Sequence, residues 1–134
     1  MIRHLSAKLL DAGYVRASFA EAALSREAEL PTGLVLGGDI HAAIPHTDVE
    51  HVLKPAVALA TLPHPVIFRH MIAPDEEVPV RIVFLLALEQ PKTQVAMLQE
   101  VAGVLQNAEL IAELLSASSV AAVQAALARR DRAI

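Results

Sequence analysis

The chain has 134 residues, which is the length of one domain, and residues 1–134 are treated as a single unit. Hydrophobic residues make up 54% and charged residues 19%, which excludes a disordered chain, and a net charge of -4 gives no electrostatic basis for binding nucleic acid or an anionic membrane. The sequence has no cysteine, which excludes disulfides and cysteine-ligated metals, and its 3% of aromatic residues is too few for base-stacking surfaces.

Two helices are predicted at the start of the chain. Apolar residues recur at helical spacing over residues 2–12, and Gly13 stands where a helix would end. A second helix is predicted over residues 18–29, because Ser18 and Glu21 have the spacing of a capping box, in which the two side chains bind the free amides of the first turn.

The middle of the chain is predicted to form strands. Residues 32–39 contain three glycines and indicate a loop or a bulged strand edge. A turn is expected at Pro63 and His64, and residues 80–88 form a continuous apolar run that is typical of a strand buried on both faces. The remaining predicted strands are residues 41–45, 57–62 and 65–68.

The last third of the chain is predicted to be helical. Helices are expected from Pro91 onward, over residues 108–115 and over residues 119–130, with Ser118 or Ser119 capping the last one. Strands between helical regions at both ends of the chain predict an α/β layer fold.

The sequence also predicts a location for the protein. The first ten residues include Arg3 and Lys8 and hold no long apolar run, so no signal peptide is expected. The longest apolar run, residues 82–88, is too short to span a bilayer. These features and the lack of cysteine predict a soluble, cytoplasmic domain.

The segment around His46 carries the clearest chemical pattern. Thr47 and Glu50 have the spacing of another capping box, which predicts a short helix that begins near Thr47 and is stopped by Pro55. His46 would then lie just before a helix N-terminus, where free amides and the helix dipole favour a negative group. A neutral imidazole at such a place could accept a phosphoryl group.

From the pattern alone, three interpretations of His46 stay open. It could be a structural or solvated histidine, a phosphoryl acceptor, or a metal ligand together with Asp48 and His51. The metal interpretation has little support, because histidines five positions apart do not share a helical face and no other metal motif is present.

Three stretches together resemble a known family. They are the residues Pro-Thr-Gly-Leu at 31–34, Ala-Ile-Pro-His-Thr-Asp at 43–48 and Glu-His-Val at 50–52. They resemble the EIIA domains of bacterial sugar phosphotransferase systems, in the fructose, mannitol and nitrogen-regulatory superfamily, with the galactitol-type branch most similar. The resemblance runs from about residue 5 to about residue 128 and implies a mixed β-sheet sandwiched between helices.

The resemblance also implies roles for single residues. His46 matches the phosphoacceptor histidine and Arg26 matches the active-site arginine, whose planar fork suits phosphate oxygens. Glu50 matches an acidic residue that either orients the imidazole or only closes the capping box. Gln94 stands where fructose- and mannitol-type members have a second histidine, which favours the galactitol-type branch. The phosphoryl group is also expected to be stabilised by Thr47 together with the amides that follow His46, and by His51.

The implied function is that of a phosphocarrier. The carrier protein HPr would donate the phosphoryl group to His46, a cysteine of EIIB would accept it, and a galactitol-like polyol would be the transported sugar. No metal and no cofactor are expected. The alternative is a regulatory module whose phosphorylation state controls a partner protein, with the same chemistry at the histidine.

The start of the chain departs from the family pattern. Family members usually open with a strand before the first helix, whereas this sequence begins inside what would be that helix. Either the sheet lacks its first edge strand or the gene start is misplaced. An exposed apolar sheet edge would favour a homodimer.

Overall fold

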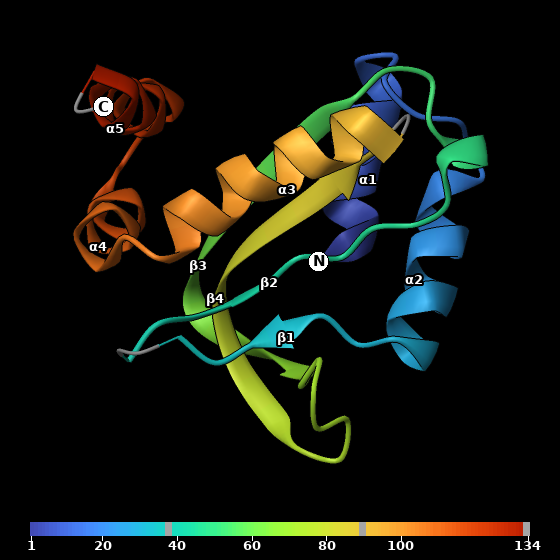
Figure 1. The fold of residues 1–134 in the computed structure, drawn as a ribbon, viewed down its shortest axis with the longest axis horizontal. Helices are drawn as coiled ribbons and strands as arrows, with labels where there is room; N and C mark the ends of the chain where they lie inside the picture. The colour runs from blue at the N-terminus through green and yellow to red at the C-terminus, as the bar shows by residue number, and fades with distance from the viewer. Residues whose placement is uncertain (37–38, 89–90, 133–134) are drawn as a thin grey trace.

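The computed structural model describes residues 1–36, 39–88 and 91–132, with the side chains of residues 91–95 and 129–132 left out. Its elements follow one another in the order α1 (Ile2–Asp11), α2 (Phe19–Glu29), β1 (Gly33–Leu34), β2 (His41–Ala43), the 3-10 turn η1 (Val49–His51), β3 (Ala56–Arg69), β4 (Glu77–Ala87), α3 (Pro91–Leu105), α4 (Ala108–Ser116) and α5 (Val120–Arg132). Figure 1 shows α3 in front of the sheet and α1 behind it.

The four described strands form one mixed sheet in the order β1-β2-β4-β3. β2 runs parallel to β4, whereas β1 and β3 run antiparallel to their neighbours. Val83 and Leu85 of β4 belong to the core under α1 and α2, whereas Phe84 and Leu86 belong to the core under α3, α4 and α5. The apolar run is continuous because both faces of this strand are buried, which confirms the predicted sheet sandwiched between helices.

The end of α1 is built as the sequence predicts. Gly13 follows the helix with a φ of +85°, a conformation that costs an L side chain strain but suits glycine. The amide of Gly13 donates to the carbonyl of Leu10, and the amide of Tyr14 donates to that of Leu9. These two bonds form a Schellman motif, which satisfies the carbonyls at the end of the helix.

The start of α2 differs from the prediction in its capping. Ser18 is the N-cap residue, but its side chain makes no capping bond. Its hydroxyl oxygen lies 2.8 Å from Nδ1 of His51 instead. The predicted capping box is therefore wrong, although the helix bounds are right within one residue, because a tertiary contact uses the hydroxyl.

The predicted turn at Pro63 and His64 is also wrong, since β3 is one strand of 14 residues. Thr61 pairs with Ile82 and Val66 pairs with Val80, so residues 62–65 stand opposite Arg81 alone. Prolines lack the amide that a ladder needs, and a bulge is how a strand accommodates them. Nε of Arg81 donates to the carbonyl of Leu62 at 3.0 Å across this bulge.

The C-terminal helices have nearly the predicted bounds. The amide of Ala122 donates to the hydroxyl of Ser119, so the predicted cap of α5 is confirmed. Within the described part of the chain, no helix combines the length and the apolar character that crossing a membrane requires. The edge strands of the described sheet are β1 and β3, and no described strand precedes α1. Dimerisation at a sheet edge stays a prediction.

Candidate functional site

His46 lies where two parallel strands end. The carbonyl of Pro45 accepts the amide of Leu86 at 2.9 Å, and His46 itself bridges to Leu86. The segment after β2 therefore continues beside the last residues of β4. The carboxyl ends of the strands in open α/β sheets are the usual place for a ligand.

The ring of His46 is oriented by the main chain. Its Nδ1 atom lies 2.9 Å from the carbonyl oxygen of Ile44, and the side chain is half-buried. Because a carbonyl oxygen only accepts, Nδ1 must carry the proton in this contact. The neutral ring then keeps its lone pair on Nε2, which is the form of imidazole that acts as a nucleophile.

The helix predicted after His46 is reduced to one turn. η1 spans only Val49–His51, and its N-cap residue Asp48 makes no side-chain capping bond. Thr47 is buried, at 6% exposed. The proposed capping box of Thr47 and Glu50 is therefore wrong, and a turn of three residues supplies little of the dipole that the sequence argument used.

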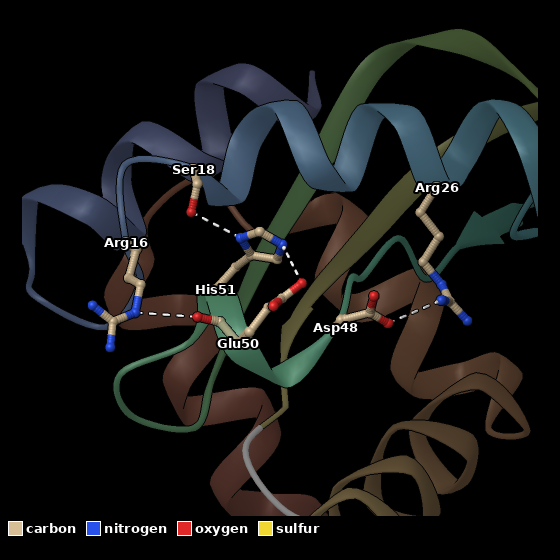
Figure 2. A network of polar contacts seen from close by, with 6 residues as sticks. All are labelled: Arg16, Ser18, Arg26, Asp48, Glu50 and His51. Carbon is tan, nitrogen blue, oxygen red and sulfur yellow. Dashed lines mark hydrogen bonds and ion pairs between the residues drawn. The ribbon is translucent and has the colours of Figure 1, made fainter.

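Arg26 points from α2 toward the segment that carries His46. Its Nη1 atom lies 3.5 Å from Oδ1 of Asp48, which is a weak contact, and Asp48 follows His46 by two positions (Figure 2). Nε of Arg26 is buried and has no hydrogen-bond partner among the described residues. A buried donor without a partner is costly, so this guanidinium is poised to bind an added acceptor.

Glu50 and His51 contact each other rather than His46. An Oε atom of Glu50 lies 3.4 Å from Nε2 of His51, and the other ring nitrogen of His51 contacts Ser18 (Figure 2). Among the described residues no hydrogen bond or ion pair joins Glu50 to the ring of His46, whose Nδ1 contacts the carbonyl of Ile44, so a role of this carboxylate in orienting the imidazole stays a prediction. Arg16 adds a bond from its Nε to the main-chain carbonyl of Glu50 at 3.1 Å.

The segment after His46 therefore lies along α2. Ser18 contacts it through His51 and Arg26 contacts it through Asp48. These two positions on the helix are eight residues apart, which is about 12 Å along its axis. Helix α2 and its N-cap residue thus contact this segment at two well-separated points.

A half-buried carboxylate, that of Glu27, lies one position after Arg26. Glu27 accepts the amide of Thr32 at 2.7 Å and the hydroxyl of Thr32 at 2.6 Å. Burial raises the pKa of Glu27 above its ordinary value of 4.5, and the two hydrogen bonds from Thr32 offset part of that effect.

Two further predictions concern Gln94 and a metal. Gln94 lies in the first turn of α3, but its side chain is outside the described residues, so its role stays a prediction. Among the described side chains, no group of three histidine, aspartate or glutamate residues is placed to hold a metal ion. His51 contacts Ser18 and Glu50, and these contacts add no support to a metal site with His46 and Asp48.

Comparisons with known proteins identify the family. The family described as the phosphoenolpyruvate-dependent sugar phosphotransferase system, EIIA 2, matches residues 1–130. The chain belongs to this family. It is therefore an EIIA component of a sugar phosphotransferase system, as the motifs around His46 predict.

Curated relatives and solved structures agree with this assignment. The galactitol-specific EIIA component of Escherichia coli (strain K12) is 32% identical over 117 residues, which are 87% of this chain and 76% of that protein. The mannitol IIA of Escherichia coli has a TM-score of 0.70 at 27% identity and covers 94% of this chain and 85% of that one. A putative IIA (PtxA) from Streptococcus mutans has a TM-score of 0.80 at 20% identity over 98% of this chain and 80% of its own, which shows the fold alone.

One solved relative includes a partner. Enzyme IIAMTL from Escherichia coli, in a complex with phosphorylated enzyme IIBMTL, has a TM-score of 0.70 at 27% identity. It covers 96% of this chain and 85% of that one.

Two contacts of the site were missed in the sequence. The acceptor for Nδ1 of His46 is the main-chain carbonyl of Ile44, and every residue has such a carbonyl, so the residue type does not predict the contact. Pro45, which lies between Ile44 and His46, indicates only that the backbone is restricted there. The contact of Ser18 with His51 joins residues 33 positions apart, and no local pattern announces it.

Proposed function

We propose that His46 accepts a phosphoryl group from phosphorylated HPr on Nε2 and passes it to a cysteine of a cognate EIIB. The observation that carries the proposal is the bond from Nδ1 of His46 to the carbonyl of Ile44. It fixes the proton on one ring nitrogen and leaves the other as the nucleophile.

The first transfer needs no proton movement at His46. The lone pair on Nε2 attacks the phosphorus, the bond from phosphorus to the donor histidine breaks, and its electron pair stays with the donor. The ring gains positive character as the new bond forms, and the carbonyl of Ile44 stabilises it through the proton on Nδ1. Phosphoryl transfer depends mainly on such positioning and charge stabilisation.

The second transfer reverses this step at Nε2. A thiolate of EIIB attacks the phosphorus, the nitrogen–phosphorus bond breaks, and the electron pair returns to Nε2. The relative solved as a complex of enzyme IIAMTL with phosphorylated enzyme IIBMTL supports EIIB as the acceptor. The galactitol-specific relatives support a galactitol-like polyol as the final substrate, which this domain need not touch.

Supporting roles follow from the surroundings of His46. Arg26 would bind phosphate oxygens, since its Nε lacks a partner and its contact with Asp48 is weak. Gln94 would donate an amide hydrogen from the first turn of α3, and the main-chain amide of Thr47 would assist. His51 would act by holding the segment in place, because Ser18 and Glu50 contact both of its ring nitrogens.

The test is phosphotransfer to the purified chain from phosphoenolpyruvate, Enzyme I and HPr, followed by intact-mass measurement. We expect one acid-labile phosphoryl group on the chain and none on a His46→Gln variant. His64→Gln is the matched control, because His64 is an exposed histidine on β3 away from the site. It should be labelled like the original chain.

The same sample distinguishes transport from regulation. Adding a purified galactitol-type EIIB should remove the label from His46. Label that stays on the chain would favour the regulatory alternative. A folded chain that takes no label from active donors, or label that persists in His46→Gln, would refute the proposal.

A further inference from the structure

We propose that Glu27 is a positioning residue for His46, acting through a relay of hydrogen bonds that crosses from α2 to the end of β2. Arg26 is followed directly by Glu27 and then by the Pro-Thr-Gly stretch at residues 31–33. Of these residues, only Arg26 has a role in the proposed function. The effect on phosphotransfer rests on that proposed function, whereas the effect on the imidazole does not.

The relay begins with the carboxylate of Glu27. One of its oxygens accepts the amide of Thr32 at 2.7 Å and the other accepts the hydroxyl of Thr32 at 2.6 Å. Thr32 is 3% exposed and Glu27 is half-buried, so both contacts are partly shielded from water. A bidentate, charge-assisted contact of this kind fixes the orientation of its partner.

The relay continues from Thr32 to the ring. The carbonyl of Thr32 accepts the amide of Ile44 at 3.3 Å, where the chain leaves β2. The carbonyl of Ile44 then accepts the proton of Nδ1 of His46 at 2.9 Å. Each residue of the relay is thus held on one side and holds the next on the other, from a side chain on α2 to the reactive imidazole.

The neighbourhood of Thr32 explains why a relay is needed. β1 has only two residues, Gly33 and Leu34, so its ladder to β2 is short. Two-residue pairing fixes a backbone poorly, and Glu27 supplies the further anchor at the residue just before β1. Without this anchor, Ile44 would lose the partner that sets its plane, and its carbonyl would turn away from Nδ1.

The consequence concerns the tautomer of His46. With the relay intact, the proton stays on Nδ1 and the lone pair stays on Nε2. If the carbonyl of Ile44 moves, the ring populates the tautomer with the proton on Nε2, which cannot attack phosphorus through that atom. Glu27 therefore affects the fraction of the reactive tautomer and not the surface that HPr contacts.

The test uses Glu27→Met, which keeps the length of the side chain and removes both acceptors, and Glu27→Gln, which keeps an acceptor for the amide and a donor for the hydroxyl. Glu29→Met is the control, because Glu29 is an exposed carboxylate on the same helix. The readouts are the imidazole nitrogen shifts of His46 by long-range proton–nitrogen NMR and the steady-state kinetics of phosphotransfer from HPr.

We expect a mixture of both tautomers in Glu27→Met and the original tautomer in Glu27→Gln and Glu29→Met. The kcat of Glu27→Met should fall roughly 10-fold with an unchanged KM for HPr, which is less than the ~100-fold that a 1 Å misplacement costs. A folded Glu27→Met variant with the original tautomer and the original kcat would overturn the proposal.

Two further outcomes distinguish a failure of the relay from a failure of the variant to fold and from a failure of the proposed function. If Glu27→Met does not fold, the Thr32→Val variant tests the relay instead, because it removes the hydroxyl contact with Glu27 and keeps the amide contact. An unchanged tautomer ratio of His46 in Thr32→Val would overturn the relay. An original chain that takes no phosphoryl group would refute the proposed function alone, since the tautomer is measured without a phosphoryl donor.

Discussion

The carbonyl oxygen of Ile44 and Nδ1 of His46 lie 2.9 Å apart across a single proline. Pro45 has a fixed φ, and its own carbonyl is held by the amide of Leu86 at 2.9 Å. The three-residue segment is therefore rigid on both sides of the proline. This rigidity defines which nitrogen of the ring is available for chemistry.

The first prediction is that phosphorylation occurs on Nε2 of His46. Nδ1 is occupied by its bond to Ile44, so the lone pair is on the other nitrogen. Phosphorus–nitrogen coupling in a nitrogen-15-labelled, phosphorylated sample identifies the bonded atom. A phosphoryl group on Nδ1 would contradict the tautomer assignment, because that nitrogen would have to lose its proton and its partner.

The second prediction concerns Ser18 and His51, whose side chains lie 2.8 Å apart. Ser18→Ala and His51→Ala should each lower the free energy of unfolding by about 1 kcal/mol, the usual net value of such a bond. Because both remove the same contact, the double variant should cost little more than either single one. Urea denaturation of the four chains measures this coupling.

The control for this pair is His51→Asn. An asparagine amide has a polar atom near the place of Nδ1, so it should keep the contact with Ser18 and lose the one with Glu50. Fully additive costs in the Ser18 and His51 variants would show that the hydroxyl and the ring do not interact in solution.

β4 was predictable from the sequence, whereas β3 was not. Burial on both faces leaves a continuous apolar run, and residues 80–88 show one, so the central strand is marked in the sequence itself. In β3, Pro63 and His64 have the composition of a turn, but pairing with β4 on both sides of them keeps the strand in one piece around a bulge. Tertiary pairing outweighs the local preference there.

The sequence drew attention to the segment that carries His46 but did not predict the side-chain contacts around it. The helix expected after Thr47 does not form. A capping pattern stabilises a helix only when several turns follow it, and η1 has only three residues. Glu50 was expected near His46, yet its carboxylate contacts His51. Side-chain contacts between α2 and this segment depend on how the two pack, and that information is not local.

The third prediction compares two glycines that are needed for different reasons. A Cβ at Gly33 would lie 2.6 Å from the main-chain oxygen of Arg69, where nothing can give way cheaply. Gly33→Ala should therefore lower the free energy of unfolding by about 2 kcal/mol through overpacking. Gly13 has open space around it but a φ of +85°, so Gly13→Ala should cost about 1 kcal/mol through strain.

Asparagine separates these two causes. It tolerates a positive φ, so Gly13→Asn should recover much of the stability lost in Gly13→Ala. Gly33→Asn should recover none, because its Cβ meets the same oxygen. Thermal or urea denaturation of the four variants measures both pairs, and recovery at Gly33 would contradict the close approach of β1 to Arg69.

The fourth prediction follows from the raised pKa of Glu27. Burial raises the pKa of this carboxyl above 4.5, so the folded chain binds its proton more tightly than the unfolded chain does. The contribution of Glu27 to stability is therefore fully present below the unfolded pKa and is lost as the pH rises through the folded pKa. Relative to Glu27→Gln, which has no proton to lose, the original chain should become less stable with increasing pH.

Urea denaturation of the two chains from about pH 4 to about pH 8 measures this difference. Arg69 lines the same cavity as residue 27 and is present in both chains. Titrations elsewhere in the molecule are common to both chains and cancel. A difference that grows in favour of the original chain as the pH rises would mean that the bonds from Thr32 outweigh burial, and that the pKa of Glu27 is lowered in the folded state.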